Sequence, residues 1–238
     1  FGTDAQKTTY LSKLASGELV GTLAVVESLD EPEAEHLATD YKGESITGTK
    51  LLVPHGQYAD IAVVLARGND GPDMVIVDLA GVERTPVSVV DPTIAAATLR
   101  FDGTGAELLG VSGEGWRQLQ SVYDRAAVLM AFEQIGGASK ALDMAVNYAK
   151  ERYAFGRPIG SFQALKHMMA DMYVALKLAE SNAYYAAWAL ENQSADLSLA
   201  AVTARVSATQ AFQLCARDNI QVHGGMGFTW EFDCHLYY

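Results

Sequence analysis

Hydrophobic residues follow two different periods along the chain, and the change falls near residues 110–115. From about residue 19 to 109, short apolar runs recur roughly every ten residues, with Gly and Pro between them, which is typical of strands in a small barrel or sandwich. The stretch "ADIAVVLARGNDGPDMVIVDLAG" places two apolar runs around Gly-Asn-Asp-Gly-Pro and predicts an antiparallel hairpin. In "ESITGTKLLVP" the Thr-Gly pair predicts a turn between two short runs, and "ATLRF" and "AELLG" are expected to be separate strands.

After residue 115 the spacing of apolar positions becomes helical. Helical patterns cover residues 116–152, 161–192 and 194–223, and the last of them ends at a pair of glycines. Helices of about thirty residues are well above the globular mean and favour an antiparallel, up-down bundle.

The predicted fold class is therefore α+β. An antiparallel β-barrel or sandwich at residues 19–112 is followed by a helical bundle at residues 113–238. The methionine stripe of the second long helix is expected to fill the bundle core, with a substrate channel as the alternative; its members are Met168, Met169 and Met172.

Composition narrows the classes of protein. With 238 residues, 50% of them hydrophobic, the chain can bury a large core. A net charge of −12 disfavours broad contact with nucleic acid or an anionic membrane, so an anionic ligand needs a local group of basic residues. The longest apolar run, residues 126–132, is too short to cross a bilayer. Cys215 and Cys234 lack ligand spacing, so we expect no disulfide scaffold, no metal site and a cytoplasmic location.

The chain begins at Phe1, with no methionine and no signal-like segment, and we expect it to be a fragment of a longer protein.

The stretch "RYAFGRPIGSFQALKHMMADM" carries the first indication of a ligand. A break rich in Gly and Pro between two long helices exposes the N-terminal amides of the second helix, which favour an anion. Arg152 and Arg157 flank the break, Phe155 offers a flat apolar face, and Gln163 is expected two residues into the helix. These residues alone predict a pyrophosphate site only weakly, and a plain turn with surface arginines is the alternative.

Two long motifs, "ERYAFGRPIGSFQALKHMMADM" and "QVHGGMGFTWEFDCHLYY", resemble the acyl-CoA dehydrogenases. The likeness covers the whole chain: residues 1–18 resemble the end of the family's N-terminal helical domain, most of which is absent here, and "ITGTKLLVPHGQYAD" resembles its middle barrel. The resemblance implies a flavoprotein oxidoreductase of lipid metabolism that uses FAD to oxidise the Cα–Cβ bond of an acyl-CoA. It also implies electron-transfer flavoprotein or a similar acceptor, and a homo- or hetero-tetramer built as a dimer of dimers.

The resemblance further implies that the two motifs reach the pyrophosphate and adenosine of a neighbouring subunit's FAD. Carried over residue by residue, the cofactor-binding positions are Arg152, Phe155, Gly156, Gln163, Gln221, Gly224 and Gly225.

The positions that resemble the flavin-ring side of the family's site depart from its pattern. The family's Thr-Glu-Pro-Gly-Ala-Gly-Ser-Asp reads "VESLDEPEAEHLAT" here, so Val26 replaces the threonine, and residues 29–33 bring bulk and negative charge. The family's Trp-Ile-Thr reads Leu52, Val53 and Pro54, which removes an aromatic plane and one backbone donor. We expect an incomplete ring pocket in this chain.

The catalytic base implied by the resemblance is also missing from its expected position. One family branch has a glutamate where this chain has Ala126, and the other uses a glutamate beyond the last motif, after Tyr238. Glu133, seven residues after Ala126 on roughly the same helix face, is a weak candidate for a substitute base, and a structural carboxylate at a subunit contact is the alternative. Asp124 is expected on a solvated face.

Two further predictions concern the last motif. His223 is expected either to hydrogen-bond near the cofactor or to pack against the bundle, and Trp230 and Tyr237 are expected at a subunit contact.

Three functions remain open at this point. The chain is a complete FAD-dependent acyl-CoA dehydrogenase, a non-catalytic partner that supplies the phosphate clamp in a heteromeric dehydrogenase, or a flavin oxidase of the same fold. The acyl chain and the electron acceptor do not follow from the sequence.

Overall fold

The computed structural model describes residues 1–30, 32–91 and 93–238. The chain forms two compact units, Phe1–Ser121 and Val122–Tyr238. Helix α1 (Asp4–Ser16) begins the first unit with a capping box, because Thr3 Oγ1 accepts from the Gln6 amide while Gln6 Oε1 accepts from the Thr3 amide. The strands that follow are β1 (Gly21–Ala24), β2 (Asp40–Lys42), β3 (Ser45–Val53), β4 (Ile61–Arg67), β5 (Pro72–Asp78), β6 (Glu83–Pro86) and β7 (Ala97–Leu108).

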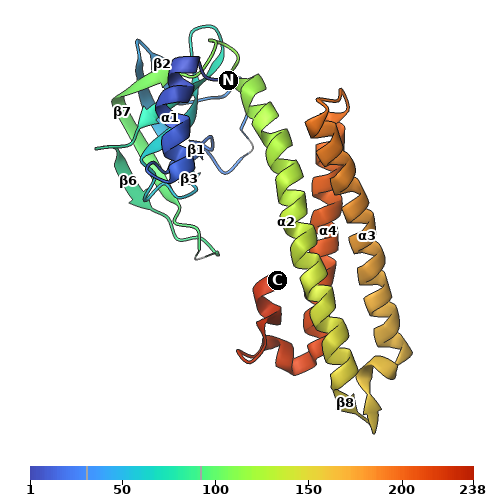
Figure 1. Cartoon of the computed structure of the whole chain (residues 1–238). Coiled ribbons are helices and arrows are strands. Elements are labelled where there is room, and N and C mark those ends of the chain that lie inside the picture. Colours follow the sequence, from blue (N-terminus) through green and yellow to red (C-terminus); the bar gives the residue numbers. More distant parts are fainter. Residues whose placement is uncertain (31, 92) are drawn as a thin grey trace. The chain divides into compact units, whose positions relative to one another are not determined.

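Strand pairing closes the sheet of the first unit into a barrel (Figure 1). The pairs β4–β2, β2–β3, β3–β7, β7–β5 and β5–β4 form a closed circuit, while β1 and β6 attach to β4 and β7. Among the described strands the pairing is antiparallel except at β1–β4 and β2–β4. The predicted barrel is confirmed, and the parallel pairing of its two shortest early strands is the feature that the sequence did not indicate.

Glycine positions explain where the expected strand boundaries hold and where they are wrong. The hairpin around residues 68–71 is confirmed, since Arg67 pairs with Pro72 across it. The turn expected at Thr47-Gly48 is wrong, because β3 runs through it; a Cβ on Gly48 would lie 2.7 Å from Thr39 Cα, so the glycine permits close backbone approach inside a strand. "ATLRF" and "AELLG" are likewise one strand, β7, which continues through Gly103.

Side chains from the barrel strands point into one apolar core. β4 and β5 are buried almost throughout, since both have neighbours on two sides in the closed sheet. Each large aliphatic residue buried in this way contributes about 1.5–3 kcal/mol relative to exposure. The core residues are Ala24, Ile46, Val53, Ala59, Ala62, Val64, Ala66, Val75, Val77, Leu79, Ala97, Leu99 and Phe101.

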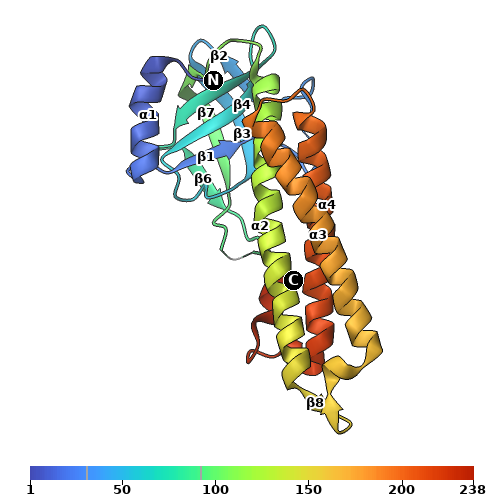
Figure 2. The same cartoon turned by 45° about the vertical axis from the view of Figure 1, so that its right-hand side comes forward.

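The second unit is an up-down bundle of three long helices, α2 (Gly115–Glu151), α3 (Gln163–Glu191) and α4 (Leu197–His223). The first turns of α2 belong to the barrel unit, where Trp116 and Leu119 join its core. Figure 2 shows the bundle from a second side, and in both views the hairpin after α2 and the end of α4 lie at the same end of it. The predicted bundle is confirmed.

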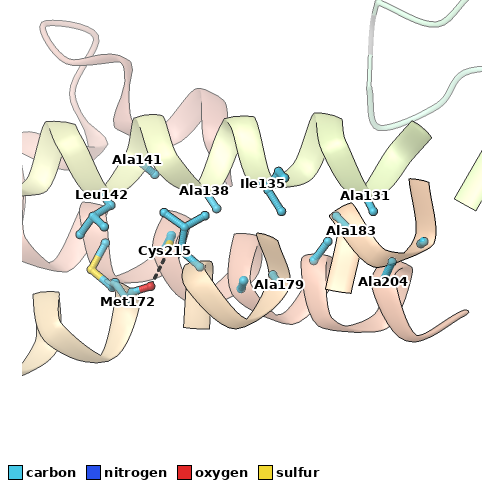
Figure 3. Close-up of a cluster of buried hydrophobic side chains, with 14 of the residues drawn as sticks. Ala131, Ile135, Ala138, Ala141, Leu142, Met172, Ala179, Ala183, Ala204 and Cys215 are labelled. Atoms are coloured by element: carbon cyan, nitrogen blue, oxygen red, sulfur yellow. Dashed lines mark hydrogen bonds between the residues drawn. The ribbon is translucent and has the colours of Figure 1, made fainter. Parts of the chain in front are cut away.

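Alanine dominates the bundle core (Figure 3). Ala131, Ala138, Ala179, Ala183 and Ala204 are fully buried, so the helices approach closely. Met172 is fully buried and Met168 and Met169 pack against the same cluster, which confirms the stripe as core filling. Cys215 Sγ lies 3.7 Å from the Met172 carbonyl oxygen, and burial raises the pKa of its thiol to about 11, so this cysteine is unreactive.

Candidate cofactor-binding site

The break between α2 and α3 is a small β-hairpin rather than an irregular start of the second helix. Strands β8 (Tyr153–Ala154) and β9 (Arg157–Pro158) pair antiparallel, and the two residues between them, Phe155 and Gly156, have φ of 54° and 78°. Two consecutive positive φ values match a type I′ turn. The 3₁₀ turn η1 (Ile159–Ser161) follows, so Gln163 is the first residue of α3, and its expected place two residues into the helix is corrected.

The Arg152 side chain is held at the base of this hairpin without a protein partner. Its amide donates to the Tyr148 carbonyl at 2.9 Å, and its carbonyl accepts from the Ile159 amide at 2.8 Å. The guanidinium is exposed and forms no ion pair with any described residue, although the whole chain is strongly acidic. A cation fixed through its backbone and left unpaired is suited to bind an anion.

Aromatic contacts order the tip of the hairpin. Phe155 is 94% exposed, and its ring meets the edge of Phe162 at a centroid distance of 6.2 Å. The Arg157 guanidinium lies 4.0 Å from the centroid of Phe162, so this arginine is engaged with an aromatic face. Of the two arginines flanking the break, Arg152 is therefore the one left unengaged.

The first turn of α3 has no charged or polar cap of its own. Phe162 occupies the cap position without a side-chain hydrogen bond, and the turn contains no acidic residue. The exposed Gln163 begins the helix there. The amides of this turn thus keep their affinity for an acceptor from outside the helix.

The end of α4 exposes a pair of glycines. Gln221 is exposed in the last turn, and its carbonyl accepts from the amide of Gly224, which has φ of 60° and ψ of −140°. No atom lies within 4 Å of the place where a Cβ would sit on Gly224 or Gly225. Both backbone positions are accordingly open to a ligand.

A hollow of about 470 Å³ brings together residues from the ends of α2 and α4. It is lined by Tyr148, Arg152, Ile159, Val222, His223, Gly224, Gly225, Met226 and Thr229. Three of the residues expected from the sequence, Arg152, Gly224 and Gly225, line this hollow although they are far apart in the chain. Phe155, Gly156, Gln163 and Gln221 are exposed nearby in the sequence but do not line it.

His223 packs against the bundle and also lines this hollow. Its ring stacks on Tyr148 at a centroid distance of 4.1 Å and lies 5.3 Å from Phe232. Nδ1 lies 2.9 Å from the Asn219 carbonyl oxygen. Burial lowers the pKa of His223 below its usual value of 6.5, because desolvation outweighs the carbonyl, which favours the charged ring.

The structure does not bring Glu133 to the hollow. Glu133 is exposed on α2, like Ala126, and residues 133 and 152 are separated by about 28 Å along the helix axis. Asp124 is not on a purely solvated face as expected: it is half-buried, and its carboxylate accepts a hydrogen bond of 2.6 Å from Ser198 on α4. Whether Glu133 is a substitute base or a subunit-contact residue stays a prediction.

In the barrel unit, the segment that departs from the family pattern is organised by a buried ion pair that the sequence reading missed. Lys50 is fully buried, and its Nζ donates to Glu27 Oε1 at 2.6 Å and to the Val25 carbonyl at 3.1 Å. Glu27 also accepts from the amides of Ala38 and Thr39, at 2.6 and 2.9 Å. Burial opposes ionisation of Glu27, but these donors outweigh it and lower the pKa of its carboxyl.

The segment tied down in this way carries the negative charge expected from the sequence. Asp30 and Glu33 line a hollow of about 430 Å³ together with Glu27 and His36. Glu31, which belongs to the replaced residues 29–33, lies outside the described residues. An anion is disfavoured beside these carboxylates.

The Leu52–Pro54 replacement is accommodated by an irregular strand. Leu52 is 40% exposed and has φ of 50°, where the register of β3 against β7 shifts. The Pro54 carbonyl accepts from Thr22 Oγ1 at 2.6 Å. The missing aromatic plane is thus not restored by another side chain at these positions.

Two 3₁₀ turns follow α4 at the C-terminus, η2 (Gly224–Phe228) and η3 (Asp233–Tyr237). Trp230, between these turns, is 89% exposed, and Tyr237, at the end of η3, is half-buried. Their placement at a subunit contact stays a prediction.

Across the described parts of the chain, no helix combines the length and the hydropathy that crossing a membrane requires.

Comparison with known proteins supplies the family. A model of the acyl-CoA dehydrogenase C-terminal domain matches residues 113–238, and the chain therefore belongs to the acyl-CoA dehydrogenase family. The resemblance inferred from the two motifs is confirmed.

Among particular relatives, acyl-CoA dehydrogenase IpdE2 of Mycobacterium tuberculosis is 36% identical over 226 residues, which cover 93% of this chain and 64% of that protein. The IpdE2 of Mycolicibacterium smegmatis is 45% identical over 119 residues, or 50% of this chain and 36% of the relative. The structure of butyryl-CoA dehydrogenase from Megasphaera elsdenii superposes with a TM-score of 0.91 at 25% identity, covering all of this chain and 66% of that one. The chain thus spans about two thirds or less of the relatives it matches.

Proposed function

We propose that this chain takes part in the α,β-dehydrogenation of an acyl-CoA thioester by supplying a clamp for the pyrophosphate and adenosine of FAD across a subunit boundary. The observation that carries the proposal is the hollow in which Arg152 meets Gly224 and Gly225. Family membership supports the reaction class, and the hollow supports the part of the cofactor that this chain binds.

The chemistry of the hollow fits a pyrophosphate. Arg152 offers charge-assisted hydrogen bonds and has no competing carboxylate among the described residues. The backbone at Gly224 and Gly225 is open, so phosphate oxygens have room to approach it. Phe155, 94% exposed at the hairpin tip, offers an apolar face for a flat ring of the same ligand.

When bound, the flavin supplies the acceptor for the hydride that leaves Cβ of the substrate. The residues of this chain bind and orient the cofactor through its phosphates and adenosine. Removal of the α-proton needs a carboxylate near the substrate. Glu133 is the candidate for this base in the chain. Electron-transfer flavoprotein or a similar protein would be the final electron acceptor.

A partner-subunit role is the more specific form of this proposal, and it is favoured by the barrel unit. The segment at residues 26–39 is fastened by Lys50 and Glu27 and places carboxylates where the family meets the flavin ring, while Leu52 and Pro54 replace the ring-packing residues. In that arrangement a second, homologous chain provides the ring pocket and the base. A complete homo-oligomeric dehydrogenase is the competing assignment.

The test is the amount of FAD in purified protein, prepared alone and co-expressed with the product of its neighbouring gene or with a homologous chain that carries the family's ring motif and base. We expect roughly one FAD per pair of chains and a flavin spectrum only in the co-expressed assembly. One FAD per chain in the protein alone would support the homo-oligomer instead, and an assembly whose FAD content does not depend on Arg152 would reject the clamp.

A further inference from the structure

We propose that His223 is a neutral hydrogen-bond acceptor that recognises a free ribose hydroxyl of the nucleotide in the hollow and discriminates against a ribose that carries a phosphate. The inference rests on the proposed clamp and adds the specificity of its adenosine part.

The hydrogen bond of His223 fixes which ring nitrogen carries the proton. Nδ1 lies 2.9 Å from the Asn219 carbonyl oxygen, and a carbonyl oxygen only accepts. In the neutral ring Nδ1 is therefore the donor, and Nε2 keeps its lone pair. No described residue hydrogen-bonds Nε2, so this acceptor is available to a ligand.

The surroundings of His223 keep the ring neutral and fixed in orientation. The side chain is buried between Tyr148, which stacks on it, and Phe232, and burial lowers its pKa. Arg152 is the charged residue that lines the same hollow. At neutral pH the hollow thus presents one cation for phosphate and one neutral acceptor that cannot donate to phosphate.

This combination matters because the proposed reaction uses two ligands with an adenosine end. The adenosine ribose of FAD has free hydroxyl groups, whereas the ribose of coenzyme A carries a 3′-phosphate. A lone pair on Nε2 accepts a hydrogen bond from a hydroxyl but is repelled by phosphate oxygens, which are themselves acceptors. His223 would reserve the clamp for the flavin's adenosine in the presence of abundant acyl-CoA.

The first test needs no ligand. Protein labelled with ¹⁵N in its histidines, measured at neutral pH, should show His223 with a protonated Nδ1 and an unprotonated Nε2. A ring protonated on Nε2, or on both nitrogens, would overturn the proposal. The His223→Phe variant, which keeps the aromatic packing, assigns the signal, and His36→Phe, in the barrel unit, is the matched control.

The second test measures binding to the assembled complex, after removal of its FAD, by calorimetry, with ADP, 3′-phosphoadenosine 5′-diphosphate and inosine diphosphate as probes. We expect ADP to bind about five- to tenfold tighter than 3′-phosphoadenosine 5′-diphosphate, which has the same pyrophosphate, because one hydrogen bond distinguishes the two probes. His223→Phe should lower this ratio to about one. Inosine diphosphate lacks the adenine amine but keeps the ribose hydroxyls. If the wild type binds it as weakly as the probe with a ribose phosphate, the contact is with the adenine amine and the ribose is rejected.

The outcomes also separate this inference from the clamp itself. If ADP binding depends on Arg152 but the preference between the two adenosine probes is the same in wild type and His223→Phe, the clamp stands and the role of His223 is wrong. If ADP binds none of the proteins, both proposals are wrong.

Discussion

The barrel unit buries its key charges, whereas the bundle unit exposes them. In the barrel, Lys50 is fully buried and donates hydrogen bonds to Glu27 and to a backbone carbonyl. In the bundle, Arg152 has a fixed backbone and a side chain that pairs with no described residue, and it lines a hollow with two open glycines. A satisfied buried charge holds a segment in place, while an unsatisfied exposed charge is available for a ligand. We therefore expect Lys50 and Glu27 to stabilise the first unit and Arg152 to bind a ligand in the second.

The largest expected effect is on the activity of the chain alone. We predict that it oxidises acyl-CoA about 10²–10⁴-fold more slowly than an assembly with a partner that has an intact ring pocket and base, because no positioned carboxylate takes the α-proton. The assay uses an artificial electron acceptor and protein of known oligomeric state. Robust turnover by the chain alone, with one FAD per chain, would contradict the need for a partner. Glu133→Gln would then test whether that carboxylate is the base.

A second prediction concerns the stability that the buried pair gives to the barrel. Lys50→Met leaves Glu27 without its charged partner and should lower the free energy of unfolding by about 3–5 kcal/mol. Lys50→Met combined with Glu27→Gln should cost less, about 1–3 kcal/mol, because the buried charge is gone although the single glutamine oxygen can replace only one of the two carboxylate oxygens that accept from the amides of Ala38 and Thr39. Chemical denaturation of the wild type, the two single variants Lys50→Met and Glu27→Gln, and the double variant measures these values. Additive losses would show that the two side chains do not act as a pair.

The pair of Lys50 and Glu27 also makes the stability of the barrel depend on pH in the acidic range. The carboxyl pKa of Glu27 is lowered in the folded state, so the unfolded chain binds its proton more readily. Its stabilisation is fully present above the unfolded pKa and is lost as the pH falls through the lower, folded value. The double variant has no carboxyl at position 27, so its free energy of unfolding should fall less than that of the wild type as the pH drops below about 4, as denaturation series at several pH values would show.

The third prediction tests the exposed charge of the bundle. Arg152→Ala should weaken FAD binding in the assembled complex by about 1.5–3 kcal/mol, because one charge-assisted interaction with phosphate is removed. Lys140→Ala removes an exposed cation from α2, the helix that ends one residue before Arg152; it is the matched control and should leave the affinity unchanged. Equal affinities of both variants and the wild type would contradict the clamp.

How far the sequence predicted the molecule also differs between the two units. Helical period predicted the bundle, because helix spacing is local and repeats over many turns, and the two motifs predicted three of the residues that line its hollow, Arg152, Gly224 and Gly225. In the barrel, Gly48 and Gly103 look like turn residues but lie inside strands, and only the approach of Thr39 explains the first of them. Nothing near Lys50 in the sequence marks it as buried, because its partner Glu27 is distant in sequence. Long-range contacts of this kind leave no local pattern.

The smallest expected effect separates folding from binding at the hairpin tip. Phe155 has φ of 54° in a type I′ turn, where Asn-Gly is the preferred pair, so a phenylalanine there costs about 1 kcal/mol of strain. Phe155→Asn should therefore raise the free energy of unfolding of the bundle by up to about 1 kcal/mol. In the assembled complex the same change should weaken FAD binding roughly fivefold, because the exposed ring is lost. Thermal unfolding and FAD titration of one variant give both numbers. If Phe155→Asn is more stable and binds FAD as tightly as the wild type, Phe155 is a tolerated surface residue. If the variant is more stable but binds FAD more weakly, the strained turn serves ligand binding.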